Sequence, residues 1–240
     1  MDDNRRDIGA EAGRIVRLAW PIALTSLNWT LMHLIDVAVV GRFGTFELGA
    51  LAAGRSLTFI TIVAGLAALA GILVFTSRAD GAGRLRDTGD ILRSGVVLGL
   101  MNGLACLALL LLWAESLLDW IGVADAFRGP GAAVVRAMAL AYPFQFVTAA
   151  ASYFLEGISR PRRVMAVNLA MLPVNAVLAW AWVGGHFGLP ALGAVGAALA
   201  TSTVSAGGAV AMLACCWTLP QARARGVRDL TPGALARAIT

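Results

Sequence analysis

The chain of 240 residues is 59% hydrophobic and only 14% charged, whereas soluble domains carry about a quarter charged residues. This composition excludes an ordinary soluble protein. The formal net charge of +5 would suit a nucleic-acid-binding protein, but the 19 basic residues, all arginines, gather between apolar stretches, so we expect no nucleic-acid partner.

The apolar residues form stretches whose length fits a lipid bilayer. Six stretches contain no Asp, Glu, Lys or Arg, and each has roughly the 20 residues that a helix needs to cross the hydrocarbon core. Helices are the expected spanning form because lipid offers no partner to exposed peptide groups. The sequence therefore predicts an all-α, polytopic membrane helix bundle with six transmembrane helices at 18–35, 56–77, 94–114, 137–155, 164–183 and 191–219.

The first predicted helix, residues 18–35, and the residue after it carry a polar stripe. At 100° per residue, Thr25, Trp29, Met32 and His33 all point within about 60° of the direction of Asp36, and leucines occupy the opposite side. A charged side chain at mid-membrane costs at least about 2.5–3.5 kcal/mol on insertion scales, so its presence calls for a functional reason. We therefore regard Asp36 as the strongest candidate for a functional residue.

A short segment occurs twice in the chain. GRFGTFELGALAAG begins at Gly41 and GHFGLPALGAVGAA begins at Gly185, and seven of the fourteen positions are identical. The first copy connects predicted helices one and two, and the second connects helices five and six. Small residues that follow each turn allow close helix packing, and in the sixth helix we expect them to form a stripe of Gly196, Ala200, Thr203 and Gly207. The half-identity favours an internal structural correspondence.

The arginines predict the orientation of the chain. Fifteen of the 19 lie in the N-terminal arm, near the connections after helices two and four, or in the C-terminal tail. By the positive-inside rule, both termini of this multi-pass chain are cytoplasmic in a bacterial-type inner membrane. Residues 1–14 are then a cytoplasmic N-terminal arm, 15–219 a six-helix lobe and 220–240 a cytoplasmic tail.

Two further stripes lie in the second half of the chain, where Pro143, like Pro21 before it, is expected to bend its helix. The fourth predicted helix carries Met138, Tyr142, Gln145, Ser152, Tyr153 and Glu156, and the fifth carries Asn168, Met171, Asn175, Ala179 and Trp182. Aromatic rings attract organic cations by about 0.5–2 kcal/mol per contact, and methionines adapt to irregular shapes. The predicted substrate-cavity residues are Trp29, Met32, Tyr142, Gln145, Tyr153, Met171 and Trp182, although aromatic and methionine positions in helices more often serve packing or interfaces.

Two stretches resemble the multidrug and toxic compound extrusion (MATE) transporters. LAWPIAL…LIDVAVVGRFGTFELGALAAG is similar to the first hairpin of that family, with Pro21 and Asp36 at matching places. FLEGISRPRRVMAVNLAMLPVNAVLAWAWVGGHFGLPALGAVGAALAT resembles the region of helices 4 to 6, including the EG-x-x-RPR connection and Asn175. The resemblance covers Ile15 to Thr218.

This resemblance implies a secondary active antiporter, not an enzyme, that exports amphipathic or cationic organic compounds in exchange for H⁺ or Na⁺ without a cofactor. Asp36 would take up the coupling ion, with Na⁺ as the only metal candidate, and Asn175 would support an ion or water network or simply bridge helices. Independently of the resemblance, His33 lies one turn before Asp36 and is a candidate proton relay or a structural hydrogen-bonding residue. The family has twelve helices in two lobes, so a second lobe is expected as a missing C-terminal half or another copy. Ala179 stands where many members have an acid or amide, which weakens a relay between helices one and five.

Other interpretations remain open at the level of sequence. Asp36 and Arg55 lie at nearly equal depths on adjoining helices, so they are also a candidate structural ion pair. Glu156 is expected to pair with Arg160 or Arg163. A lipid-linked oligosaccharide flippase-like exporter would prefer a more basic cavity, and a non-transporting membrane assembly protein would not need Asp36. An intramembrane enzyme is disfavoured because the chain has no G-x-S-x-G, HExxH or P-loop motif.

Overall fold

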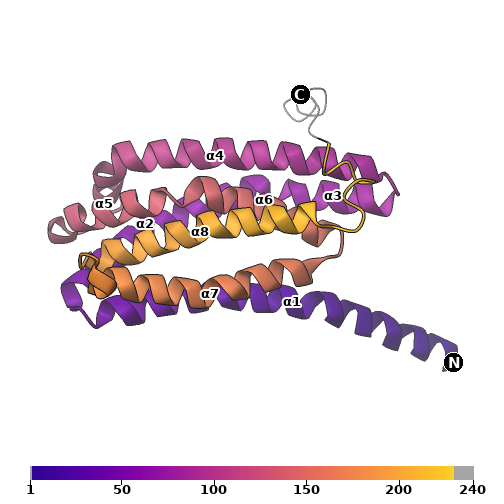
Figure 1. Ribbon diagram of the computed structural model, residues 1–240, viewed down its shortest axis with the longest axis horizontal. Coiled ribbons are helices and arrows are strands. Elements are labelled where there is room, and N and C mark those ends of the chain that lie inside the picture. Colours follow the sequence, from indigo (N-terminus) through magenta and orange to yellow (C-terminus); the bar gives the residue numbers. More distant parts are fainter. Residues whose placement is uncertain (1, 230–240) are drawn as a thin grey trace.

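The computed structural model describes residues 2–229, with side chains described from residue 19 onward, and this part of the chain contains only helices, turns and connecting segments. The helices are α1 (Asp2–Gly41), α2 (Thr45–Leu69), α3 (Gly71–Gly81), α4 (Leu85–Trp120), α5 (Asp125–Ala139), α6 (Tyr142–Gly157), α7 (Pro161–Gly184), the short 3₁₀ turn η1 (His186–Gly188) and α8 (Gly193–Trp217). They run roughly side by side along one axis (Figure 1). The all-α membrane bundle predicted from composition is therefore confirmed.

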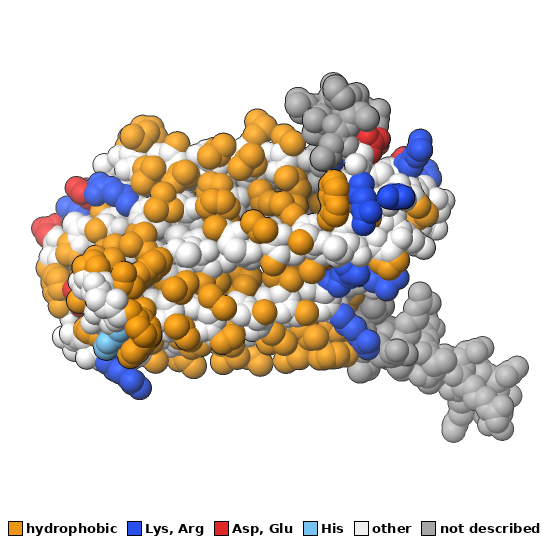
Figure 2. Space-filling model, in the orientation of Figure 1, with side chains coloured by type: hydrophobic (Ala, Val, Ile, Leu, Met, Phe, Trp, Pro, Cys, Tyr) orange, Lys and Arg blue, Asp and Glu red, His pale blue; other side chains and the backbone are white. Residues whose placement is uncertain are grey.

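Five spans in the described residues are individually long and apolar enough to cross a membrane, with α2 and α3 forming one of them. The sixth is the pair α5 and α6, whose axes differ by 48°. Side chains in the middle of the visible face are mostly apolar, and arginines gather toward its ends (Figure 2). This distribution is the one that six membrane crossings require.

The two prolines that were expected to bend helices differ in whether the helix is interrupted beside them. The break between α5 and α6 falls just before Pro143, which cannot donate a backbone hydrogen bond and whose ring crowds the preceding turn. Pro21 lies inside α1, which continues from Asp2 to Gly41 without a break. Residues 2–14 of the predicted arm thus have a helical backbone, while the side chains of its arginines lie outside the described residues.

Glycines bring α4 and α6 into direct backbone contact. Gly99 and Gly103 are buried one turn apart on α4, and Gly95, one turn earlier, faces the side chain of Ile72 in α3. A Cβ atom at Gly99 would lie 2.8 Å from the carbonyl oxygen of Phe146, and one at Gly103 would lie 2.7 Å from the backbone nitrogen of Pro143. This is the small-residue contact by which membrane helices pack when lipid gives no hydrophobic driving force.

The small-residue stripe predicted for the last helix is only half correct. Gly196 and Ala200 are buried, and Gly196 lies against the backbone of Trp182. Thr203 and Gly207 are exposed, and nothing surrounds Gly207 within 4 Å. The buried face of α8 passes instead through Thr201, Ser205 and Gly208, because α8 packs against α6 as well as α7.

The two copies of the repeated segment meet at one end of the bundle. The carboxylate of Glu47, in the first copy, accepts a hydrogen bond of 2.7 Å from the backbone nitrogen of Ala194, in the second copy. Ala194 lies in the first turn of α8, where backbone N–H groups have no partner within the helix and attract negative charge. Glu47 therefore connects the α1–α2 hairpin to the start of α8.

Replacing Glu47 with glutamine is expected to lower the free energy of unfolding by about 1 kcal/mol, because the substitution removes the charge at the α8 N-terminus. The measurement is the thermal unfolding midpoint followed by tryptophan fluorescence. Glu115→Gln is the matched control, since Glu115 is an exposed carboxylate paired with Arg136. Equal midpoints for the two variants would contradict a role for Glu47 in joining the two hairpins.

The segment after α8 folds back onto the bundle. The guanidinium of Arg225, which is 7% exposed, donates to the carboxylate of Asp80 in α3 at 2.6 Å. Arg93 of α4 donates to the carbonyl oxygens of Gly226 (2.5 Å) and Asp229 (3.1 Å). Residues 220–229 of the predicted tail are thus attached to α3 and α4, and residues 230–240 lie outside the described part of the chain.

Candidate functional site

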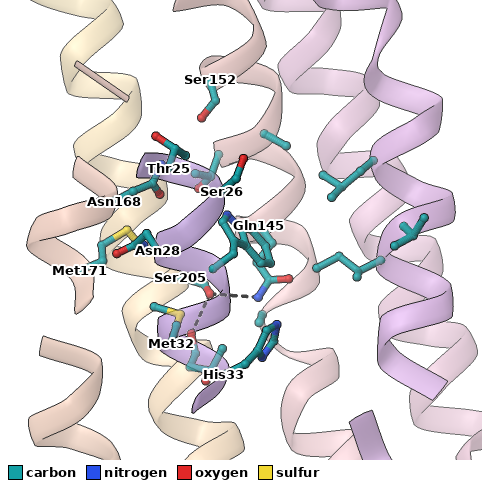
Figure 3. Close-up of a pocket in the computed structure, with 18 of the residues that line it drawn as sticks. Thr25, Ser26, Asn28, Met32, His33, Gln145, Ser152, Asn168, Met171 and Ser205 are labelled. Carbon is teal, nitrogen blue, oxygen red and sulfur yellow. Dashed lines mark hydrogen bonds between the residues drawn. The ribbon is translucent and has the colours of Figure 1, made fainter. Parts of the chain in front are cut away.

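A cavity of about 700 Å³ opens between helices from both halves of the chain. Its wall is built by α1, α2, α6, α7 and α8, with Met138 at the end of α5. Figure 3 shows polar side chains from α1, α6, α7 and α8 around this space. The volume is in the range of pockets that hold drug-sized molecules.

Every residue of the polar stripe predicted on the first helix lies in the wall of this cavity. Thr25, Trp29, Met32, His33 and Asp36 all belong to its wall. Trp29 is 39% exposed, and its ring centroid lies 6.4 Å from that of His33. Apart from the adjacent Met32 and His33, successive members of the stripe are three or four positions apart, so one face of α1 presents all of them to the same space.

The stripe on the fourth predicted helix also lies in the wall. Ser152, Tyr153 and Glu156 line the cavity from the α6 end nearer the arginine-rich connections, and Gln145 donates a hydrogen bond of 3.3 Å to the hydroxyl of Ser205 (Figure 3). Tyr142 is only 2% exposed, and its hydroxyl donates to the carbonyl oxygen of Thr58 at 2.8 Å. Tyr142 therefore joins α6 to α2 while it forms part of the wall.

The stripe on the fifth predicted helix divides into two groups. Asn168 and Met171 line the cavity. Trp182 does not, because it lies near the far end of α7, where its carbonyl oxygen accepts from the backbone nitrogen of Leu192. Asn175 is fully buried behind the wall and contacts Asp36 rather than the open space.

Asp36 is the centre of a buried polar network. Its side chain is 1% exposed and accepts three hydrogen bonds, from the Arg55 guanidinium at 2.5 Å, the Asn175 amide at 3.0 Å and the Thr201 hydroxyl at 3.3 Å. The three donors come from α2, α7 and α8. One carboxylate of α1 is therefore bound to three other membrane-spanning helices.

The candidate ion pair between Asp36 and Arg55 is present. The Arg55 side chain is 16% exposed and also donates to the carbonyl oxygen of His33 at 3.2 Å. A buried carboxylate with a paired guanidinium and two neutral donors is electrically balanced, which explains how the charge is held in the membrane. In the described residues no hydrogen bond joins the His33 imidazole to Asp36.

Glu156 differs from the sequence expectation. It lines the cavity, and among the described residues no ion pair joins it to Arg160 or Arg163. Arg163 instead donates to the carbonyl oxygen of Cys215 at 2.7 Å, at the end of α8. The predicted pairing with Arg163 is therefore wrong, because that guanidinium connects α7 to α8, and Glu156 leaves a carboxylate at the cavity wall.

Three amide oxygens near the cavity are buried without a hydrogen-bond partner in the described residues. They belong to Asn28, Gln145 and Asn175. Asn28 and Gln145 line the cavity, and Asn175 lies beside Asp36. An unpaired buried acceptor costs about 1–3 kcal/mol, so these oxygens favour a donor group, a water molecule or a cation in their neighbourhood.

Several wall residues were not identified from the sequence. Thr201 and Ser205 lie one turn apart on α8, on a face adjacent to the predicted stripe of that helix. Asn28 lies on α1 between Thr25 and Trp29, and α2 contributes Thr58, Phe59 and Ile62. The spacing of Thr201 and Ser205 was a usable signal in the sequence, whereas nothing in the apolar pattern of α2 distinguishes a wall residue from a packing residue.

The geometry supports binding of an organic cation with apolar parts. The wall combines an exposed indole, three methionine side chains that can adapt, and the Glu156 carboxylate. The Asp36 network at its edge offers carboxylate, amide and hydroxyl oxygens, the ligand types that Na⁺ and other hard cations prefer, and the carboxylate is also a proton acceptor. The residues present therefore fit either a proton or Na⁺.

Comparison with known proteins gives a family assignment and several relatives. The MatE family model matches residues 21–181. A probable multidrug resistance protein NorM of Caulobacter vibrioides is 35% identical over 221 residues, which cover 90% of this chain and 46% of that protein. The multidrug resistance protein PmpM of Pseudomonas aeruginosa is 28% identical over 197 residues, covering 82% and 41%.

Solved structures show the same fold. A crystal structure of MATE in the bent conformation superimposes with a TM-score of 0.78 at 21% identity, over 94% of this chain and 51% of that one. The eukaryotic MATE transporter AtDTX14 gives a TM-score of 0.75 at 20% identity, over 92% and 49%. The chain thus spans about half the length of the relatives and structures that it matches.

Proposed function

The chain belongs to the MatE family of membrane transporters, and we propose that it forms one six-helix lobe, residues 15–219, of an exporter of amphipathic or cationic organic compounds driven by H⁺ or Na⁺. Membership of this family also excludes the interpretation as an enzyme. The observation that carries the proposal is the Asp36 network, in which one buried carboxylate at the wall of a drug-sized cavity binds groups from three other helices.

The Asp36 network supports coupling between ion binding and transport, because its contacts depend on the charge of the carboxylate. When a proton or Na⁺ occupies the Asp36 carboxylate, its attraction for the Arg55 guanidinium is reduced, and the contacts that hold α1 to α2, α7 and α8 change together. Asn175 and Thr201 keep the carboxylate oriented in either state. An ion gradient can then bias which way the cavity opens.

The second lobe of this exporter is part of the proposal. The matched relatives are about twice as long, so a further six-helix lobe is expected, either in a C-terminal continuation or as another copy of the chain. Both termini would face the cytoplasm of a bacterial inner membrane, with the arginine-rich connections on that side. Efflux of a fluorescent lipophilic cation from proteoliposomes tests transport and the need for a second lobe. It is measured for this chain and for the complete protein translated from the reading frame that contains it. No gradient-driven efflux from either preparation would refute transport.

Replacing Trp29 with alanine is expected to weaken binding of a fluorescent lipophilic cation by about 3- to 30-fold, because the indole offers its face to the cation inside the cavity. Fluorescence anisotropy of the purified chain in detergent measures this affinity. Trp120→Ala is the matched control, since Trp120 is 85% exposed and lies outside the cavity wall. A similar loss in both variants would contradict the assignment of this cavity as the substrate site.

A further inference from the structure

A second, polar cavity lies at the arginine-rich end of the bundle, away from the proposed transport site. It has a volume of about 380 Å³ and is formed where the segment after α8 folds back over the start of α4. Four arginines line it, Arg86, Arg93, Arg223 and Arg228, together with Asp90 and Asp229. Positive charge is therefore in excess within a hollow of defined shape.

Two of the four arginines hold the cavity in place. Arg93 pairs with Asp90 and donates to the carbonyl oxygens of Gly226 and Asp229, so it connects α4 to the segment after α8. Arg228 donates to the carbonyl oxygen of Trp217 and lies over its ring at 5.9 Å. These contacts hold α4, the end of α8 and the segment after α8 in fixed positions around the cavity.

The other two arginines are free to bind a ligand. Arg86 and Arg223 are both exposed, and neither guanidinium makes a hydrogen bond or ion pair with another residue that the structure describes. A guanidinium presents a rigid fork of donors that matches the oxygens of a phosphate group. Two unpaired guanidinium groups at one hollow are thus suited to an anionic phosphate.

The position of the cavity along α4 indicates where that phosphate comes from. Arg93 immediately precedes the charge-free stretch 94–114, so the cavity lies at the level where the hydrocarbon core begins. Leu100 and Leu104 follow on the same face of α4 as Arg86 and Arg93, and they are 44% and 50% exposed. A basic hollow above an exposed apolar helix face fits the headgroup and acyl chains of a lipid.

We propose that Arg86 and Arg223 bind the phosphate of an anionic glycerophospholipid, whose acyl chains lie along the Leu100 and Leu104 face of α4. The lipid would thereby attach the folded-back segment and the start of α4 to the membrane surface. This binding is independent of ion-driven transport, since none of its residues belongs to the substrate cavity.

The test uses native mass spectrometry of the full chain in detergent, titrated with dioleoylphosphatidylglycerol, dioleoylphosphatidylcholine or sodium phosphate. We expect the wild-type chain to bind phosphatidylglycerol at least about ten-fold more tightly than phosphatidylcholine. The double variant Arg86→Gln/Arg223→Gln should lose about 10- to 30-fold in affinity for phosphatidylglycerol, at about 1 kcal/mol for each arginine.

The matched control is Arg84→Gln/Arg162→Gln, which removes the same charge from the same end of the bundle without touching the cavity. Equal losses in both double variants would overturn the proposal, since they would indicate attraction by net charge alone. Competition by sodium phosphate at the same concentration as the lipid would also overturn it, by making free phosphate the ligand. If the double variant fails to fold, the affinity of the single variant Arg86→Gln for phosphatidylglycerol tests the proposal instead. The Arg86 side chain is exposed and makes no contact that the fold requires.

Discussion

Replacing Asp36 with asparagine is expected to reduce gradient-driven efflux by about ten-fold or more, while the helical bundle remains folded. Asparagine has the shape of aspartate but cannot take up a proton or give a charged oxygen to Na⁺. It also cannot form the ion pair with Arg55, although the Asn175 and Thr201 contacts can persist. The measurement is efflux of a fluorescent cation from proteoliposomes that contain the full product of the reading frame, under an imposed pH or Na⁺ gradient.

Arg55→Gln separates coupling from a purely structural ion pair. If Asp36 serves mainly to balance Arg55, both single variants should lose activity and stability equally, and the double variant should recover much of each. If Asp36 carries the coupling ion, Arg55→Gln weakens gradient-driven efflux but keeps part of it, because Asp36 still takes up the ion and still contacts Asn175 and Thr201. The double variant then behaves as Asp36→Asn. Unchanged efflux in Asp36→Asn, or full recovery in the double variant, would contradict coupling through Asp36.

Replacing Gly103 with leucine is expected to destabilise the bundle by about 3 kcal/mol, at the upper end of the usual cost of overpacking. A side chain at this position would meet backbone rather than a movable side chain, since its Cβ would lie 2.7 Å from the Pro143 nitrogen and 2.9 Å from the Tyr142 carbonyl oxygen. The α4–α6 contact would have to open, and with it the end of α6 that carries Tyr142 and Gln145. The measurement is the thermal unfolding midpoint of the detergent-solubilised chain.

Gly207→Leu is the matched control for this substitution. Gly207 lies inside a spanning helix in the same way, but nothing surrounds it within 4 Å. Because glycine disfavours a helix interior by about 0.8–1.0 kcal/mol relative to alanine, the control should be neutral or slightly stabilising. An unfolding midpoint of Gly103→Leu equal to that of Gly207→Leu would show that the glycine contact between α4 and α6 does not limit helix approach.

The helical periodicity of the sequence predicted the cavity-facing side of α1 and α6 correctly, but it failed at one end of α7. Met171 and Trp182 point in nearly the same direction on a helical wheel, yet only Met171 lines the cavity. Eleven residues of helix separate the two by about 16 Å along the axis. A wheel gives the direction of a side chain but not its depth, and the cavity ends before Trp182.

The sequence by itself determined the class of the protein. Charge-free stretches of spanning length, separated by arginine-rich connections, permit only a membrane helix bundle, because lipid leaves no other way to satisfy the backbone. The acid at position 36 was visible as a candidate for the same reason, since an ionisable group in such a stretch is costly.

Only the tertiary structure decided which residues complete the site. Arg55, Asn175 and Thr201 are separated from Asp36 by 19, 139 and 165 positions in the chain, and they meet it because α2, α7 and α8 pack around α1. Such contacts between distant residues leave no periodic signal in a single sequence. Helix neighbours depend on close packing of small residues such as Gly99 and Gly103, and this complementarity exists only between folded surfaces.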